Sequence, residues 1–181
     1  MTTRGGPIIV LDVETQHLAQ EVGGWRNPHK LRVSVAVTYN AETGLYQTYL
    51  EDQMDALFEE LWAAGQVVGY NLLRFDYPVL QPYTPFRLHD LPTVDMLDHL
   101  ERRLGFRVSL DAVAGATLGV SKSADGILAV RWFRQGDLQR VSDYCRQDVE
   151  LTHGVYEFGR QQGFVRYRDR NYRICQVPVR W

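Results

Sequence analysis

The hydrophobic positions of the first part of the chain have the spacing of strands. Residues 8–11 form a continuous apolar run that ends at Asp12, a pattern typical of a strand buried on both faces. Apolar residues alternate along 31–39, and a second short run at 45–50 follows turn residues. This arrangement predicts a hairpin beside the first strand.

The later segments have mostly helical spacing. Apolar residues recur every three or four positions in 54–61 and again in 141–158, and a short apolar run at 67–70 lies between them. Two further helices are predicted at 93–104, with Asp95 and Asp98 on its polar side, and at 109–119, with Ser109 as N-cap. Strands followed by alternating strands and helices predict an α/β fold, a mixed central β-sheet flanked by α-helices.

Length and composition predict one domain spanning residues 1–181. The 181 residues are 45% hydrophobic and carry a net charge of −2, so any nucleic-acid binding must use a local basic patch. The two cysteines fit neither a disulfide scaffold nor a zinc site, which favours a reducing, cytoplasmic location. The apolar runs are too short for a signal peptide or a membrane span, so we expect no membrane association.

Acidic residues follow the first buried run. Asp12 and Glu14 are two apart in an extended segment, so their side chains share one face of the strand while Val13 points to the other. The alternative is a solvated strand end, because an acid pair at this spacing is common by chance. The unusual feature is the uninterrupted apolar run that precedes the pair.

The segments 71–76 and 144–148 carry two more acids. Asp76 lies where a helix is expected to begin, and the helix dipole there favours an ionised carboxylate; the alternative is a simple capping residue. Tyr144 and Asp148 are four apart and therefore lie on one helical face, which is the apolar stripe. A carboxylate in such a stripe needs a partner, and a cation is the simplest one.

The four acids together predict a metal site. Two like charges about 4 Å apart repel by roughly 4 kcal/mol at an effective dielectric near 20, so the four acids are either scattered in the fold or converge and bind cations. Oxygen ligands without nearby Cys or His favour Mg²⁺ or Mn²⁺ over zinc. Two such ions would activate water and stabilise the leaving oxygen of a phosphodiester, which is nuclease chemistry.

The three acidic segments also resemble the motifs of a known family. The sequence L-D-V-E-T at 11–15, the N-x-x-x-F-D pattern at 71–76 and the Y-x-x-x-D pattern at 144–148 are similar to the motifs of the DEDD, or DnaQ-like, 3′→5′ exonucleases. The resemblance covers nearly the whole chain. It implies a ribonuclease-H-like fold and release of nucleoside monophosphates from the 3′ ends of single-stranded DNA or RNA.

The resemblance also implies roles for particular residues. The two metal ions would be held by four catalytic acids, Asp12, Glu14, Asp76 and Asp148, with Glu14 also facing the terminal 3′-hydroxyl. Tyr144, four residues before the last acid, is typical of the tyrosine subtype, known as DEDDy. A phenol with a pKa near 10 is protonated at pH 7, so we expect Tyr144 to orient the attacking water.

The segment from Ser109 to the third motif, which includes Lys122, Gly126 and Trp132, is similar to ribonuclease-H-like domains that accompany helicases. This narrower resemblance implies a helicase or another DNA- or RNA-processing partner, for example in DNA repair. Lys122 is a candidate phosphate contact, although a loop lysine is more often simply solvated. Trp25 is expected to serve packing.

Further substrate contacts are expected within the motifs and near the end of the chain. Thr15, Asn71 and Phe75 lie beside the predicted acids. Residues 164–181 predict a C-terminal hairpin or tail in which Arg166 and Arg168 share one strand face among aromatic residues, a composition that suits single-stranded nucleic acid. The alternative is a terminal hairpin with a solvated arginine face.

Two other functions remain compatible with the sequence. A ribonuclease-H-fold endonuclease would use a similar acid cluster on an internal phosphodiester, although the third motif argues against it. A non-catalytic nucleic-acid-binding or helicase-docking module would be expected to lack at least one acid, and all four are present. The choice between DNA and RNA depends on contacts that the motifs do not specify.

Overall fold

The computed structural model describes residues 5–120, 126–169 and 171–181. A five-stranded mixed sheet has the order β3-β2-β1-β4-β5, and a separate two-stranded sheet pairs β6 with β7. The strands are β1 (Ile8–Thr15), β2 (Val33–Asn40), β3 (Leu45–Leu50), β4 (Gln66–Gly69), β5 (Thr93–Asp95), β6 (Phe164–Arg168) and β7 (Ile174–Pro178). The α-helices are α1 (Met54–Ala63), α2 (Tyr77–Leu80), α3 (Met96–Leu104), α4 (Leu110–Leu118), α5 (Gly126–Arg134) and α6 (Leu138–Gln162).

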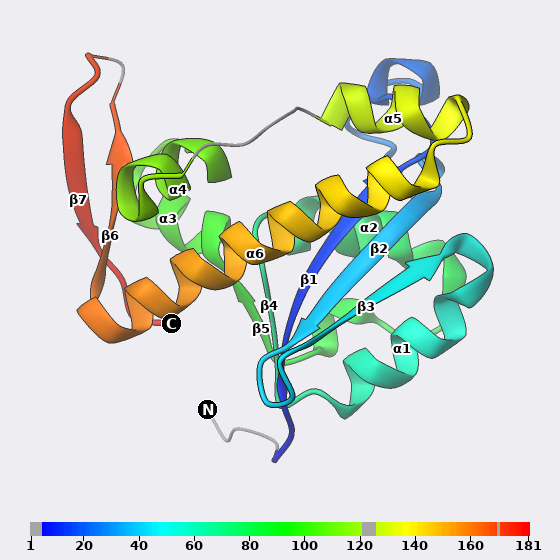
Figure 1. Ribbon diagram of the computed structural model, residues 1–181, viewed down its shortest axis with the longest axis horizontal. Helices are drawn as coiled ribbons and strands as arrows, with labels where there is room; N and C mark the ends of the chain where they lie inside the picture. The colour runs from blue at the N-terminus through cyan, green and yellow to red at the C-terminus, as the bar shows by residue number, and fades with distance from the viewer. Residues whose placement is uncertain (1–4, 121–125, 170) are drawn as a thin grey trace.

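Helices cover both faces of the large sheet, and α6 runs across one of them (Figure 1). Val10 and Val68 pack on that face against residues of α3, α4 and α6. Ile9 and Leu11 pack on the other face against α1 and α2. The predicted α/β architecture and the double burial of the first strand are therefore confirmed.

The strand β1 lies at the centre of the sheet and extends beyond its parallel neighbour. It pairs with β2 in antiparallel fashion along most of its length, whereas its parallel pairing with β4 covers only Ile8, Ile9 and Val10. Asp12 and Glu14 therefore lie past the last β4 pair, where the chain that leaves β4 turns away. This offset leaves room beside β1 for the segment that carries Asp76.

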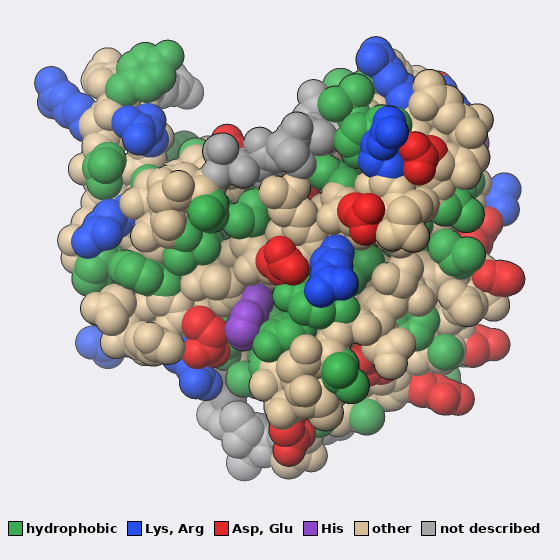
Figure 2. Space-filling model, viewed as in Figure 1, with side chains coloured by type: hydrophobic (Ala, Val, Ile, Leu, Met, Phe, Trp, Pro, Cys, Tyr) green, Lys and Arg blue, Asp and Glu red, His purple; other side chains and the backbone are tan. Residues whose placement is uncertain are grey.

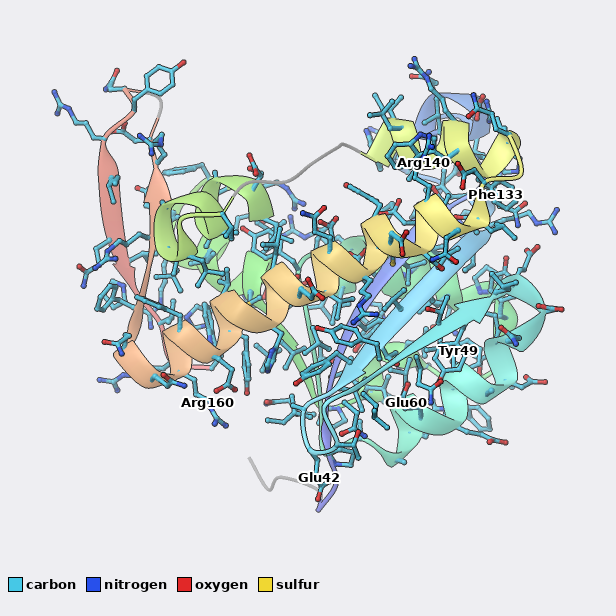
Figure 3. The ribbon with its side chains drawn as sticks, in the orientation of Figure 1. Glu42, Tyr49, Glu60, Phe133, Arg140 and Arg160 are labelled. Carbon is cyan, nitrogen blue, oxygen red and sulfur yellow. The ribbon has the colours of Figure 1, made fainter. Side chains whose placement is uncertain are left out.

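The outer part of the sheet is tied to α1 by a shared carboxylate. Glu60 accepts hydrogen bonds from the hydroxyls of Thr38 at 2.6 Å and Tyr49 at 3.0 Å. Figure 3 shows Tyr49 of β3 beside Glu60 of α1. Burial, the charge of Glu60 and this bond raise the pKa of Tyr49 to about 12, so its hydroxyl stays protonated and the link holds near neutral pH.

The helix predicted at 93–104 is shorter than expected. Thr93–Asp95 pairs with β4 as the edge strand β5, and α3 begins only at Met96. Asp95 is therefore not on the polar side of a helix: it is buried, and its carboxylate caps α3. The helical spacing of the later apolar residues continues back into the strand, so periodicity alone placed the start of the helix too early.

The other predicted helices match the structure closely. Ser109 caps α4, accepting a bond from the backbone N–H of Ala112, and Gly119 ends that helix in a left-handed conformation. The long helix α6 carries the expected inward stripe. Beyond it, β6 and β7 form the predicted C-terminal hairpin, which packs on α4 and on the last turns of α6.

Candidate active site

Asp12 and Glu14 lie on the face of β1 that α6 covers. Alternation along the strand puts them on the same side as Val10, while Val13 points into the core with α1 and α2. Glu14 is buried and Asp12 is half-buried. The two carboxylates therefore lie at the end of β1, directly after its buried apolar run.

The helix α6 brings a third carboxylate to this pair. Tyr144 and Asp148 are both buried on the side of α6 that faces β1. One carboxylate oxygen from each of Asp12, Glu14 and Asp148 lies within 4.8 Å of the other two. The expected convergence of strand and helix acids is therefore present in the structure.

Cys145 connects α6 directly to β1. Its thiol lies 3.3 Å from both the backbone oxygen and Oδ2 of Asp12, as a hydrogen-bond donor. Burial and the negative charge of Asp12 raise the pKa of this thiol, which keeps it protonated and able to donate. The thiol thereby holds one carboxylate oxygen of Asp12 toward α6.

Asp76 reaches the site from a different type of element. The chain leaves β4 through Asn71, which has a left-handed φ of 81°, and forms the π-helical turn η4 (Leu72–Asp76). Asp76 ends this turn and is only 2% exposed. The turn contacts β1, and burial, followed by the negative charge of Asp12, raises the pKa of Asp76 well above its usual range.

These residues fit divalent cations. Asp76 Oδ1 is buried and has no hydrogen-bond partner among the described residues, which is costly for a carboxylate unless a cation is bound. An all-oxygen donor set suits Mg²⁺ or Mn²⁺ better than softer metals. Asp12, Glu14 and Asp148 thus form a candidate metal centre between β1 and α6, and Asp76 on η4 is a further candidate ligand beside it.

A cavity of about 550 Å³ opens beside the carboxylates. One wall carries Asp12, Glu14, Tyr144 and Asp148, and the rest of the lining is largely apolar. Residues of that lining include Leu18, Ala19, Trp25, Leu31, Phe75, Ile127 and Val130. The cavity therefore combines a charged wall with a surface that suits an aromatic or aliphatic group.

Trp25 was expected to serve packing, and that interpretation is wrong. Its side chain is 74% exposed at the cavity, edge-on to Phe75 with ring centroids 6.1 Å apart. The sequence gives one hint of this position. Trp25 follows two glycines and precedes Asn27 and Pro28, residues that interrupt regular strands and helices, so a place in the core had little support.

The other candidate residues divide into near and remote sets. Thr15 and Phe75 line the cavity, as does His17, whose backbone oxygen accepts a bond from the Thr15 hydroxyl at 3.1 Å. Asn71 lies at the start of η4, where its side-chain oxygen accepts a bond from Arg107 at 2.8 Å. Lys122 lies outside the described residues, so the structure does not test it.

Arg166 and Arg168 lie on the C-terminal hairpin. Arg166 packs over the rings of Phe158 and Phe164, at 5.8 and 5.2 Å from their centroids, and Arg168 donates to the backbone oxygen of Tyr172. Phe158 is ten residues beyond Asp148, or about 15 Å along α6. The structure therefore does not bring these arginines into the acid cluster.

The comparisons with known proteins agree with this architecture. The family model described as RNase_H superfamily matches residues 9–158, a span that contains all four acids. A comparison with curated proteins gave no match. Within the described part of the chain, no helix is both long enough and apolar enough to cross a membrane. The chain belongs to the RNase H superfamily, and its acid cluster fits a metal-dependent nuclease.

Proposed function

We propose that this protein is a two-metal-ion 3′→5′ exonuclease of the tyrosine subtype. The observation that carries the proposal is the position of Tyr144, which lines the same cavity as Asp12, Glu14 and Asp148 and lies one helical turn before Asp148. A buried tyrosine hydroxyl usually has a hydrogen-bond partner, and here the nearby charges are those of Asp148, Glu14 and Asp12. At a hydrolytic site this hydroxyl is well placed to orient water.

Four carboxylates are proposed to hold the two ions, Mg²⁺ or Mn²⁺: Asp12, Glu14, Asp76 and Asp148. The bound ions would supply Lewis acidity toward the attacking water and the leaving 3′-oxygen. The protein would contribute ligands from three rigid elements, so that little reorganisation is needed when the phosphodiester enters. Glu14 is proposed to face the terminal 3′-hydroxyl as well.

Tyr144 is proposed to act as a hydrogen-bond donor and orienting group. Burial and the charges of Asp148, Glu14 and Asp12 raise its pKa above the ordinary value for a phenol. The hydroxyl is therefore protonated throughout the physiological pH range and does not act as a base. Its proposed role is to fix the position of the attacking water in the cavity.

The apolar wall of the cavity favours the proposal that the substrate end is single-stranded. The ring of Trp25 is largely exposed beside the carboxylates, and an unpaired base is free to stack on such a ring, whereas a paired base is held by its partner strand. Thr15 and Phe75 are proposed as further contacts to the terminal nucleotide. Asn71 and the untested Lys122 stay predictions, as do a helicase partner, a role in DNA repair and a cytoplasmic location.

The test is a digestion of labelled single-stranded DNA, duplex DNA and RNA in Mg²⁺, Mn²⁺ or chelator. We expect stepwise shortening from the 3′ end of a 5′-labelled single strand, release of nucleoside monophosphates, and no reaction in chelator. The relative rates on DNA and RNA would assign the sugar preference, which the acid cluster does not determine.

A matched substrate with a blocked 3′ end separates the proposal from its main rival. An exonuclease stalls on the blocked strand, whereas an endonuclease of the same superfamily cleaves it internally. Internal cleavage of the blocked strand contradicts the exonuclease proposal. Absence of any metal-dependent cleavage, together with tight binding of the same strands, would favour a non-catalytic binding module.

A further inference from the structure

Asp95 is a buried carboxylate that receives four backbone hydrogen bonds. It is 7% exposed and stands at the end of the edge strand β5. Its Oδ1 accepts from the N–H groups of Leu97 at 3.0 Å and Asp98 at 3.2 Å, which caps α3. The same oxygen accepts from Asn71 at 2.9 Å, and Oδ2 accepts from Leu73 at 3.0 Å.

Two of these bonds hold the start of the turn that carries Asp76. Asn71 and Leu73 open η4, and Asp76 closes it. The turn is an unusual piece of backbone, because Asn71 has a left-handed φ and a π-helical turn rarely persists without external support. The Asp95 carboxylate supplies that support from the neighbouring strand.

Other contacts of this turn lie nearer the surface. Arg107 donates to the side chain of Asn71 at 2.8 Å, Arg74 pairs with Glu101 at 2.9 Å, and His89 contacts the backbone oxygen of Leu73 at 3.1 Å. Bonds between exposed groups compete with water and constrain the backbone weakly. Among the described contacts of η4, those to Asp95 have a buried carboxylate as the acceptor.

We propose that Asp95 is a positioning residue for the metal site, which fixes the η4 backbone so that Asp76 presents its carboxylate beside Asp12. The role rests on the proposed metal ligands and is independent of whether cleavage starts at an end or within a strand. Asp95 would not touch the metal or the substrate. It would act as a buried support of a ligand, a type of contact known to tune metal affinity.

The two oxygens of Asp95 make this role separable from simple helix capping. In Asp95→Asn, the amide oxygen can keep the three bonds at the Oδ1 position, including the cap, and asparagine is a good N-cap. The amide nitrogen then faces the N–H of Leu73, and two donors cannot bond to each other. The substitution should preserve α3 and disturb η4.

The test measures Mn²⁺ binding to the full chain without nucleic acid, by the loss of the free-ion electron paramagnetic resonance signal. We expect Asp95→Asn to weaken Mn²⁺ binding about 10-fold to 100-fold while the thermal transition stays cooperative. Asp98→Asn is the matched control, because Asp98 lies in the first turn of α3, pairs with the exposed Arg102 and makes no described bond to η4. It should bind Mn²⁺ like the wild type.

Nuclease assays give a second measurement. The Asp95→Asn variant should need a higher Mg²⁺ concentration for half-maximal rate, and excess Mg²⁺ should restore much of kcat. Wild-type Mn²⁺ affinity in Asp95→Asn overturns the proposal, and so does a loss of affinity that accompanies loss of the cooperative thermal transition. If the wild-type protein itself does not bind Mn²⁺, the proposed function fails instead.

Discussion

The acid cluster and the C-terminal hairpin are both rich in charged residues, but the burial and the partners of those side chains differ. Glu14, Asp76 and Asp148 are buried on three elements that meet at one end of the large sheet. On the hairpin, Arg166 is half-buried against two aromatic rings, and Arg168 is exposed and donates to a backbone carbonyl. In Figure 2, basic side chains are visible along the hairpin edge at the left.

The difference shows which charge patterns carry functional information. Converging buried carboxylates are unfavourable without a cation, so a chain that keeps them must have a use for them. Exposed arginines are stable in water whether or not they bind a ligand. Substitutions in the acid cluster should therefore affect activity much more than substitutions in the hairpin.

Replacing a proposed metal ligand should have the largest effect. Asp148→Asn is expected to lower kcat/KM about 1000-fold or more, because loss of metal stabilisation removes several kcal/mol and each 1.36 kcal/mol is a factor of ten. The fold should persist, since one of the repelling charges is gone. Asp143→Asn is the control on the same helix, where Asp143 is exposed and accepts from Gln139. Full metal-dependent activity in Asp148→Asn would contradict the site.

Tyr144→Phe should have the next largest effect. We expect kcat to fall about 10-fold to 100-fold with little change in KM, because the ring is kept and only the orienting hydroxyl is lost. Tyr156→Phe is the matched control, since Tyr156 lies farther along α6 and its hydroxyl bonds Gln66 at 2.8 Å. Steady-state kinetics that show a pure affinity defect for Tyr144→Phe would exclude the orienting role.

Trp25→Ala should raise KM for a single strand about tenfold and change kcat little. A stacked base contributes about 1–3 kcal/mol, and alanine removes the exposed ring. Trp25→Phe keeps an aromatic face and should stay near the wild type. An unchanged KM in Trp25→Ala would show that the terminal base is held elsewhere in the cavity.

Arg168→Gln should have the smallest effect. If this exposed arginine contacts a phosphate of a long single strand, binding should weaken about twofold to threefold and the salt dependence of log K should fall by about one phosphate contact. Cleavage of a dinucleotide should not change. Arg160→Gln, on α6 and labelled in Figure 3, is the control. An unchanged salt dependence in Arg168→Gln would favour the solvated hairpin.

Much of the site followed from local spacing. Alternation predicted that Asp12 and Glu14 share one face of the first strand, and helical spacing predicted that Tyr144 and Asp148 share one face of a helix. Both placements are present in the structure. These rules depend only on the geometry of a single strand or helix. The three motif segments could therefore be placed on their elements before any contact between them was known.

Other features depend on neighbours that lie far away in the sequence. The apolar spacing around Asp95 predicted a helix, but this segment pairs with β4. Asp95 is therefore the last residue of a strand and lies beside the η4 backbone. Trp25 is exposed because its segment lines the cavity wall rather than the core. No local period encodes either contact.

The sequence by itself determined the fold class, the superfamily and the elements on which the candidate acids lie, because strand and helix periodicity and motif spacing are local properties. Only the tertiary structure decided which of these side chains meet. The offset between β1 and β4, the π-helical turn at Asp76 and the buried support from Asp95 arise from packing between distant segments. Long-range pairing therefore turns a set of well-placed acids into one candidate metal site.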